Sequence, residues 1–206
     1  MSTATEAHPT FGPTALATPA NALTMARLLS SPALLALVLA TGPATWLLTA
    51  LWILFSGSDG LDGWVARRMG ATRSGAFLDP LADKFLVLGV LVGLAGRGYF
   101  SWLPVALIAL REVGMSLFRS YAGRRGVSIP ARRTAKAKTF LQDVVILLAL
   151  LPPVGLHALG EVRALLWVAV ALTLYTGLEY ARDGRHLLAR TAERPAVSGP
   201  PAPDAR

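Results

Sequence analysis

This chain contains six apolar segments, and as helices most of them would be about as long as a lipid bilayer is thick. An α-helix rises about 1.5 Å per residue and the hydrocarbon core is about 30 Å thick, so about 20 apolar residues span it. The segments, two of them short, lie at residues 24–40, 46–67, 77–96, 102–121, 138–151 and 163–181. This pattern predicts an all-α fold, a polytopic membrane bundle of six transmembrane helices, in one catalytic domain over residues 20–187.

The composition supports a membrane protein. Of the 206 residues, 53% are hydrophobic and only 16% are charged, and the mean hydropathy is +0.51. A soluble domain has about 25% charged residues. The chain has no cysteine, which excludes disulfides and thiolate metal sites.

The two ends differ from the apolar middle. Prolines interrupt the small and polar residues 1–19, which predicts a disordered N-terminal segment, and we expect a flexible tail over residues 188–206. The first residues lack the basic and apolar regions of a cleavable signal peptide, so none is expected. Pro32 predicts a kink in the first span, which leaves residues 20–30 as an N-terminal interfacial helix.

The net charge of +8 is distributed unevenly. The connections near residues 41–45, 97–101 and 152–163 carry only Arg97 and Arg163, whereas the opposite connections and the C-terminal tail are rich in arginine and lysine. This bias predicts a multi-pass membrane protein with both termini in the cytoplasm. The basic residues would attract anionic membrane lipids. No nucleic-acid recognition motif accompanies them, so nucleic acid is not an expected partner.

Four carboxylates lie within two of the apolar segments. Asp59 and Asp62 are three residues apart, and Asp79 and Asp83 are four apart, so on helices each pair shares one face. An ionised carboxylate inside a bilayer costs several kcal/mol and normally has a function and a partner. The short connection between the two segments predicts antiparallel neighbours on which the carboxylates converge. Two Mg²⁺ or Mn²⁺ ions, which prefer oxygen ligands, would relieve the repulsion.

These carboxylates belong to a longer pattern. Residues 59–67 read D-x-x-D-G-x-x-A-R, and after seven residues positions 75–83 read G-x-x-x-D-x-x-x-D. The pattern resembles the signature of the CDP-alcohol phosphatidyltransferase family, and the resemblance covers about residues 19–182. The forms L-D-P-L-A-D-K, P-A-N-A-L-T-M-A-R, Arg111-Glu112, G-V-x-I-P-A and K-A-K-T-x-x-Q are similar to family members whose acceptor is sn-glycerol 3-phosphate.

The resemblance implies roles for individual residues. The phosphatidyl group would pass from CDP-diacylglycerol to the acceptor alcohol, with release of CMP. The implied location is the bacterial cytoplasmic (inner) membrane, with the active site facing the cytoplasm. Asp83 would act as general base as well as metal ligand. The remaining metal ligands would be Asp59, Asp62 and Asp79, and the CDP-diacylglycerol site would comprise Asn21, Thr24, Gly63, Arg67 and Thr72.

Glycerol 3-phosphate is a dianion, so its site should be cationic. The candidates for the acceptor phosphate are Arg111, Arg119, Lys136 and Lys138. Two alternatives stay open at this point, because Arg111 can instead form a buried ion pair with Glu112, and the other three can extend to the membrane surface. Lys84 points off the Asp79/Asp83 face and is expected to be structural or interfacial.

Residues 89–93 form a G-x-x-x-G motif. This motif predicts a homodimer in which the third helix of one chain contacts the third helix of the other.

Three alternative functions also remain. The first is the same transfer to inositol phosphate, phosphatidylglycerol or serine. The second is transport of divalent cations or protons, since intramembrane acids can line ion paths, and the third is lipid binding without catalysis.

Overall fold

The computed structural model describes residues 19–69, 73–124 and 133–192. These residues form seven helices and no strand, which confirms the all-α prediction. The helices are α1 (Pro19–Thr41), α2 (Trp46–Met69), α3 (Arg73–Gly96), α4 (Trp102–Arg124), α5 (Arg133–Leu150), α6 (Pro152–Gly155) and α7 (Leu159–Ala192). The predicted disordered N-terminal segment and most of the predicted tail lie outside the described residues.

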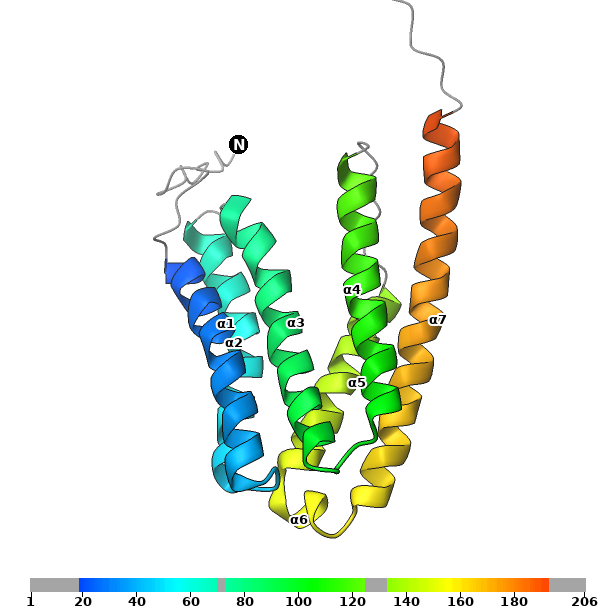
Figure 1. Ribbon diagram of the computed structural model, residues 1–206. Helices are drawn as coiled ribbons and strands as arrows, with labels where there is room; N and C mark the ends of the chain where they lie inside the picture. The colour runs from blue at the N-terminus through cyan, green and yellow to red at the C-terminus, as the bar shows by residue number, and fades with distance from the viewer. Residues whose placement is uncertain (1–18, 70–72, 125–132, 193–206) are drawn as a thin grey trace, which may run out of the picture.

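The six long helices form an antiparallel bundle (Figure 1). Helices α1, α2 and α3 lie on one side, and α1 packs closely on α3 and also on α2. Helices α4, α5 and α7 form the other side, which meets the first through contacts of α3 with α4 and of α2 and α3 with α5. The turns after α1 and α3, together with α6, lie at the lower end of Figure 1. The end of α2, the start of α3 and the end of α4 lie at the upper end.

Local signals explain where these helices end. Gly42 and Gly98 have φ of +85° and +74°, a conformation that favours glycine and terminates α1 and α3. Thr45 caps α2, because its Oγ1 accepts a hydrogen bond of 3.2 Å from the Leu48 backbone N–H. The predicted loops at residues 41–45 and 97–101 are thus present. Helix α6 was not predicted, and α7 extends eleven residues past the end of the predicted span.

The predicted N-terminal interfacial helix is not a separate element. Helix α1 runs continuously through Pro32, so residues 20–30 and the following segment form one rod. Proline removes one backbone hydrogen bond, but packing can maintain the helix around it. The structure shows such packing, because Ser31, next to Pro32, donates a 2.6 Å hydrogen bond to the Phe85 carbonyl oxygen on α3.

The G-x-x-x-G motif on α3 faces α1 of the same chain. A Cβ atom at Gly89 would lie 2.8 Å from Ser31 Oγ, and one at Gly93 would lie 3.0 Å from Val38 Cγ1. These glycines therefore allow α1 and α3 to approach closely. The prediction that they join two chains is wrong, because α1 already covers them.

The hydrophobic core lies towards the lower end of the bundle. Its buried residues come from the second half of α1 and α3, the first half of α2, α4 and α7, and the end of α5. Trp52, Leu91, Ile108, Ile146 and Leu166 are among them, each at most 2% exposed. Among the described residues a second, smaller apolar cluster contains Ala122 near the end of α4 and Tyr180 on α7.

One helix segment among the described residues, Leu159–Arg182 in α7, is long and apolar enough to cross a membrane on its own composition. Met25–Thr41 and Trp46–Ser58 are shorter apolar stretches. Each of the six long helices exposes large apolar side chains, including Leu29, Leu54, Phe85, Leu110, Phe140 and Leu178.

Candidate active site

Both aspartate pairs lie within helices. Asp59 and Asp62 belong to α2, and Asp79 and Asp83 belong to α3, so the helical state that their spacing required is present. The side chains of Asp59, Asp62 and Asp79 lie outside the described part of the structure, and their convergence stays a prediction. The Asp83 side chain is described: it is half-buried and lines a cavity between α3, α4 and α5.

A buried arginine lies beside the first pair. Arg27 on α1 is 1% exposed, and its Nη2 donates a 3.2 Å hydrogen bond to Ser58 Oγ on α2. Ser58 directly precedes Asp59 in the chain. We did not select Arg27 as a site residue, although a basic residue within an apolar segment was a usable signal. It brings a positive charge to the part of α2 that carries the predicted metal ligands.

Two adjoining cavities extend from Asp83 into the bundle. The smaller, of about 50 Å³, is lined by Asp83, Lys84, Val87, Leu88, Glu112, Lys138, Thr139 and Gln142. The larger, of about 140 Å³, is lined by Lys84, Arg111, Glu112, Met115, Arg119, Lys138, Thr139 and Tyr180. Four residues line both cavities: Lys84, Glu112, Lys138 and Thr139. The carboxylate predicted to be the base therefore lies next to a pocket rich in cations.

Glu112 holds two of those cations together. Its Oε1 accepts hydrogen bonds from Arg111 Nη1 at 3.0 Å and from Lys138 Nζ. Glu112 and Lys138 are 5% and 4% exposed, so this is a buried ion-pair network that joins α4 to α5. The ion pair that we kept as an alternative for Arg111 is present, and it leaves Arg111 on the cavity wall. Glu112 is a residue whose position in the site the sequence did not reveal.

Arg111 is also fixed against α7. Its Nη2 donates a 3.1 Å hydrogen bond to Thr176 Oγ1. A Cβ atom at Gly177 would lie 3.2 Å from Arg111 Cγ and 3.3 Å from its Nε, so glycine leaves room for this side chain. Arg111 Nε is buried and has no hydrogen-bond partner among the described residues. The two hydrogen bonds from Nη1 and Nη2 thus hold the guanidinium group in place.

The remaining basic candidates divide into two groups. Arg119 lines the larger cavity and lies over the Tyr180 ring, 5.9 Å from its centroid. Lys136 is exposed and lines neither cavity. Lys84, expected to be structural or interfacial, donates a hydrogen bond to Ser116 Oγ and also lines both cavities. Of the four predicted phosphate ligands, the structure therefore brings Arg111, Arg119 and Lys138 together and adds Lys84.

Four of the five predicted CDP-diacylglycerol residues belong to helices. Thr72 lies outside the described residues, and so do the side chains of Asn21, Thr24 and Arg67. Asn21 and Thr24 belong to α1, while Gly63 and Arg67 belong to α2. Their contacts with the nucleotide stay predictions.

Among the residues whose side chains the structure describes, no group of three or more His, Cys, Asp or Glu side chains is close enough to bind a metal ion. Three of the four predicted ligands, Asp59, Asp62 and Asp79, are not among those residues. What the structure adds is a half-buried Asp83 beside the cavities, and carboxylate oxygens are the ligand type that Mg²⁺ and Mn²⁺ prefer.

Comparison with known proteins agrees with this chemistry. The family model for CDP-alcohol phosphatidyltransferase matches residues 17–175. A relative from Mycobacterium tuberculosis, named probable phosphatidylglycerophosphate synthase, is 40% identical over 189 residues, which cover 87% of this chain and 89% of the relative. Relatives from Rickettsia bellii and Shigella flexneri, named CDP-diacylglycerol–glycerol-3-phosphate 3-phosphatidyltransferase, are 35% and 37% identical. These matches cover 78% and 69% of this chain and 91% and 82% of the relatives.

The matched residues contain the whole aspartate pattern and the residues that line both cavities up to Gln142. Identity of 35–40% over most of both chains is enough to establish common family membership. The chain belongs to the CDP-alcohol phosphatidyltransferase family.

Proposed function

We propose that the chain transfers the phosphatidyl group from CDP-diacylglycerol to sn-glycerol 3-phosphate, which forms phosphatidylglycerophosphate and releases CMP. The names of relatives that share 35–40% of their residues with it support this acceptor. The structural observation that carries the proposal is a cavity next to Asp83 with four basic side chains and one carboxylate on its wall. An excess of positive charge suits a dianionic acceptor and not serine, which has no phosphate.

The cavity also suits the size of the acceptor. Its two parts have volumes of about 140 and 50 Å³, below the roughly 300–1,000 Å³ of pockets for drug-sized ligands. We assign the acceptor phosphate to Arg111, Arg119 and Lys138, and add Lys84. Lys136 remains a predicted ligand with less support, because it is exposed and outside the cavity wall.

The reaction needs an activated hydroxyl group beside the lipid-bearing phosphorus. With the acceptor phosphate held by Arg119 and Lys138, its hydroxyl end would extend into the smaller cavity, towards Asp83. Asp83 would take the hydroxyl proton as the new oxygen–phosphorus bond forms and the bond to CMP breaks. Positioning and charge stabilisation contribute most of the rate in reactions of this type. Arg67 would stabilise the phosphate of the departing CMP.

The family is metal-dependent. We assign two Mg²⁺ or Mn²⁺ ions to Asp59, Asp62, Asp79 and Asp83, with Gly63, Asn21, Thr24 and Thr72 as nucleotide contacts. Bound ions would neutralise charge on the pyrophosphate. The oxygen-only donor set fits such ions and excludes the thiolate sites that soft metals prefer.

The family is also membrane-embedded. We place all six long helices across a bacterial cytoplasmic membrane, because each exposes large apolar side chains that lipid would cover. The upper end in Figure 1, which carries Arg68, Arg73 and Arg124, would face the cytoplasm with both termini and the active site. A homodimer stays a prediction, and its interface must lie away from Gly89 and Gly93.

The decisive experiment measures CMP release by the purified protein from CDP-diacylglycerol with glycerol 3-phosphate, inositol phosphate, phosphatidylglycerol or serine in turn. Turnover that requires glycerol 3-phosphate is the expected result. Turnover with inositol phosphate but not with glycerol 3-phosphate would show that the acceptor is wrong and the reaction class is right. No CMP release with any acceptor would contradict the enzymatic function itself.

A further inference from the structure

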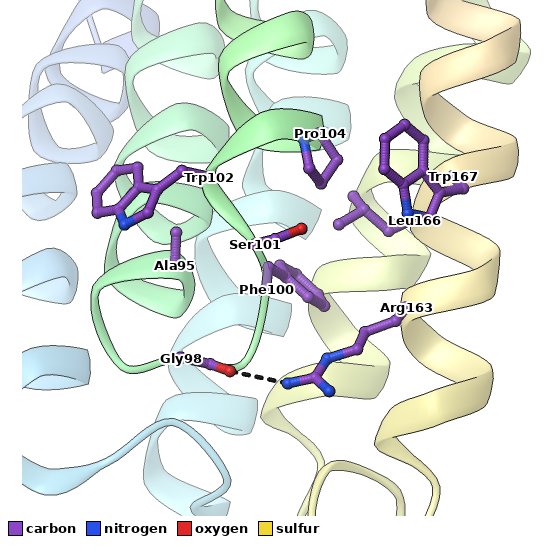
Figure 2. A pocket seen from close by; sticks show the side chains of 9 residues that line it. All are labelled: Ala95, Gly98, Phe100, Ser101, Trp102, Pro104, Arg163, Leu166 and Trp167. Atoms are coloured by element: carbon purple, nitrogen blue, oxygen red, sulfur yellow. Dashed lines mark hydrogen bonds between the residues drawn. The ribbon is translucent and has the colours of Figure 1, made fainter.

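A separate pocket of about 520 Å³ opens at the lower end of the bundle, away from Asp83. Its wall is formed by the turn between α3 and α4 and by the first turns of α7 (Figure 2). The lining residues are Ala95, Gly98, Phe100, Ser101, Trp102, Pro104, Arg163, Leu166 and Trp167. None of them belongs to the predicted active site, so the pocket requires its own explanation.

The pocket combines a buried apolar floor with an open aromatic rim. Phe100 and Leu166 are almost fully buried, whereas Trp102 and Trp167 are 58% and 46% exposed. In Figure 2 the two indole rings stand on opposite sides of the pocket, one from α4 and one from α7, with Phe100 between them. Exposed tryptophans are typical of the level where lipid chains meet the headgroups. The volume lies within the range of pockets that bind small amphiphiles.

One positive charge is fixed at the edge of this apolar surface. Arg163 Nε donates a 2.6 Å hydrogen bond to the Tyr99 carbonyl oxygen. Its Nη2 donates a 2.8 Å hydrogen bond to the Gly98 carbonyl oxygen, drawn as a dashed line in Figure 2. These two bonds hold the guanidinium plane, and among the described residues Nη1 makes no hydrogen bond. A guanidinium group held in this way is already ordered for a phosphate oxygen, so less entropy is lost on binding.

The charge of Arg163 is not balanced within the pocket. None of the nine lining residues is acidic. Glu161 lies on the same turn of α7, but residues two apart on a helix do not face each other, and Glu161 does not line the pocket. A ligand that brings an ammonium group would find no carboxylate on this wall, whereas a ligand with a net negative phosphate would find the arginine.

We infer that this pocket binds one anionic phospholipid of the leaflet opposite the active site, with its phosphate on Arg163 and an acyl chain between Trp102 and Trp167. The inference rests on the proposed membrane orientation, which puts this end at the outer surface. The site is distinct from the acceptor and nucleotide sites at the cytoplasmic end. It would bind lipid that is neither substrate nor product during turnover.

The test is native mass spectrometry of the purified full chain in a nonionic detergent, titrated with dioleoyl phosphatidylglycerol or dioleoyl phosphatidylcholine. We expect one phosphatidylglycerol to bind about tenfold more tightly than phosphatidylcholine, because the phosphate of either lipid can contact Arg163 but the choline ammonium finds no carboxylate on the pocket wall. Ser101→Trp should fill the pocket and weaken phosphatidylglycerol binding about tenfold while the Arg163 hydrogen bonds remain. Arg163→Gln should abolish the preference between the two lipids.

Arg97→Gln is the matched control, because Arg97 directly follows the end of α3 at Gly96 but does not line the pocket. Equal binding of both lipids by the unmodified chain, or unchanged phosphatidylglycerol binding in Ser101→Trp, would overturn the inference. So would an equal loss in Arg97→Gln and Arg163→Gln, which would show unspecific attraction. CMP release is measured on the same samples. Absence of CMP release would contradict the proposed function, whereas the lipid-binding result tests the pocket independently.

Discussion

The Lys138 ammonium group on α5 donates a hydrogen bond to the Glu112 carboxylate on α4, inside a cavity that we assign to a phosphate. A carboxylate in an anion site is unexpected, because it competes with the ligand. Here it holds Lys138 and Arg111 at one point and lowers the repulsion between them while no acceptor is bound. A buried pair of this kind is costly to break from one side, because the remaining charge keeps no partner.

Glu112→Gln tests this role. We expect the variant to be destabilised by about 3–5 kcal/mol, because two buried cations lose their counter-charge. Glycerol 3-phosphate or inorganic phosphate should restore more thermal stability to the variant than to the unmodified chain, because the dianion supplies the missing charge. Thermal unfolding with and without phosphate measures both effects. Glu161→Gln, at the exposed start of α7, is the control, and an unchanged unfolding temperature in Glu112→Gln would contradict the role.

Asp83→Asn removes the proposed base and keeps the side-chain volume. Turnover should fall about 100- to 10,000-fold, the usual contribution of a general base. Binding of Mn²⁺, measured by calorimetry, should persist in weakened form, because three carboxylates remain. Rates near those of the unmodified protein, measured as CMP release at saturating substrates, would remove Asp83 from this role.

Arg119→Ala should raise the KM for glycerol 3-phosphate about tenfold with a smaller change in kcat, because one charge-assisted contact to the phosphate is lost. The sequence predicts the same direction for Lys136→Ala. Since Lys136 is exposed and outside the cavity wall, we expect a change of about twofold or less. Initial rates over a range of acceptor concentrations distinguish the two variants. A larger increase of the KM in Lys136→Ala than in Arg119→Ala would show that the acceptor phosphate binds outside this cavity.

Gly93→Leu should destabilise the bundle by about 1–3 kcal/mol, because its side chain would push into Val38 and Leu35 on α1. Gly114→Leu is the matched control on α4, where nothing among the described residues lies within 4 Å of an added Cβ. Thermal unfolding and size-exclusion chromatography are measured together. A variant with unchanged stability but an altered oligomeric state would show that Gly93 contacts a second chain instead of α1.

Chelation of divalent ions should abolish CMP release, because the carboxylates would be left without the ions that allow them to lie together. Adding Mg²⁺ or Mn²⁺ after removal of the chelator should restore it. Activity that survives a chelator present in large excess would contradict the predicted metal site.

The sequence alone determined the helices and the family. The apolar lengths indicate the six long helices, and local signals mark three of their ends, namely the glycines at positions 42 and 98 and the cap at Thr45. The aspartate pattern needed only its spacing to indicate the chemistry. The sequence missed α6 and the added length of α7, and it wrongly divided α1 at Pro32, where packing on α3 keeps the helix continuous.

Which side chains meet across helices was decided by the tertiary structure. Glu112 and Lys138 are 26 residues apart, and nothing near either residue indicates the other. The same holds for Gly89 and Gly93, whose small size suits a second chain as well as α1 of this one. Local hydrogen bonds determine whether a segment is helical and which residues share a face. Which other helix each face contacts depends on how all six long helices pack around the core.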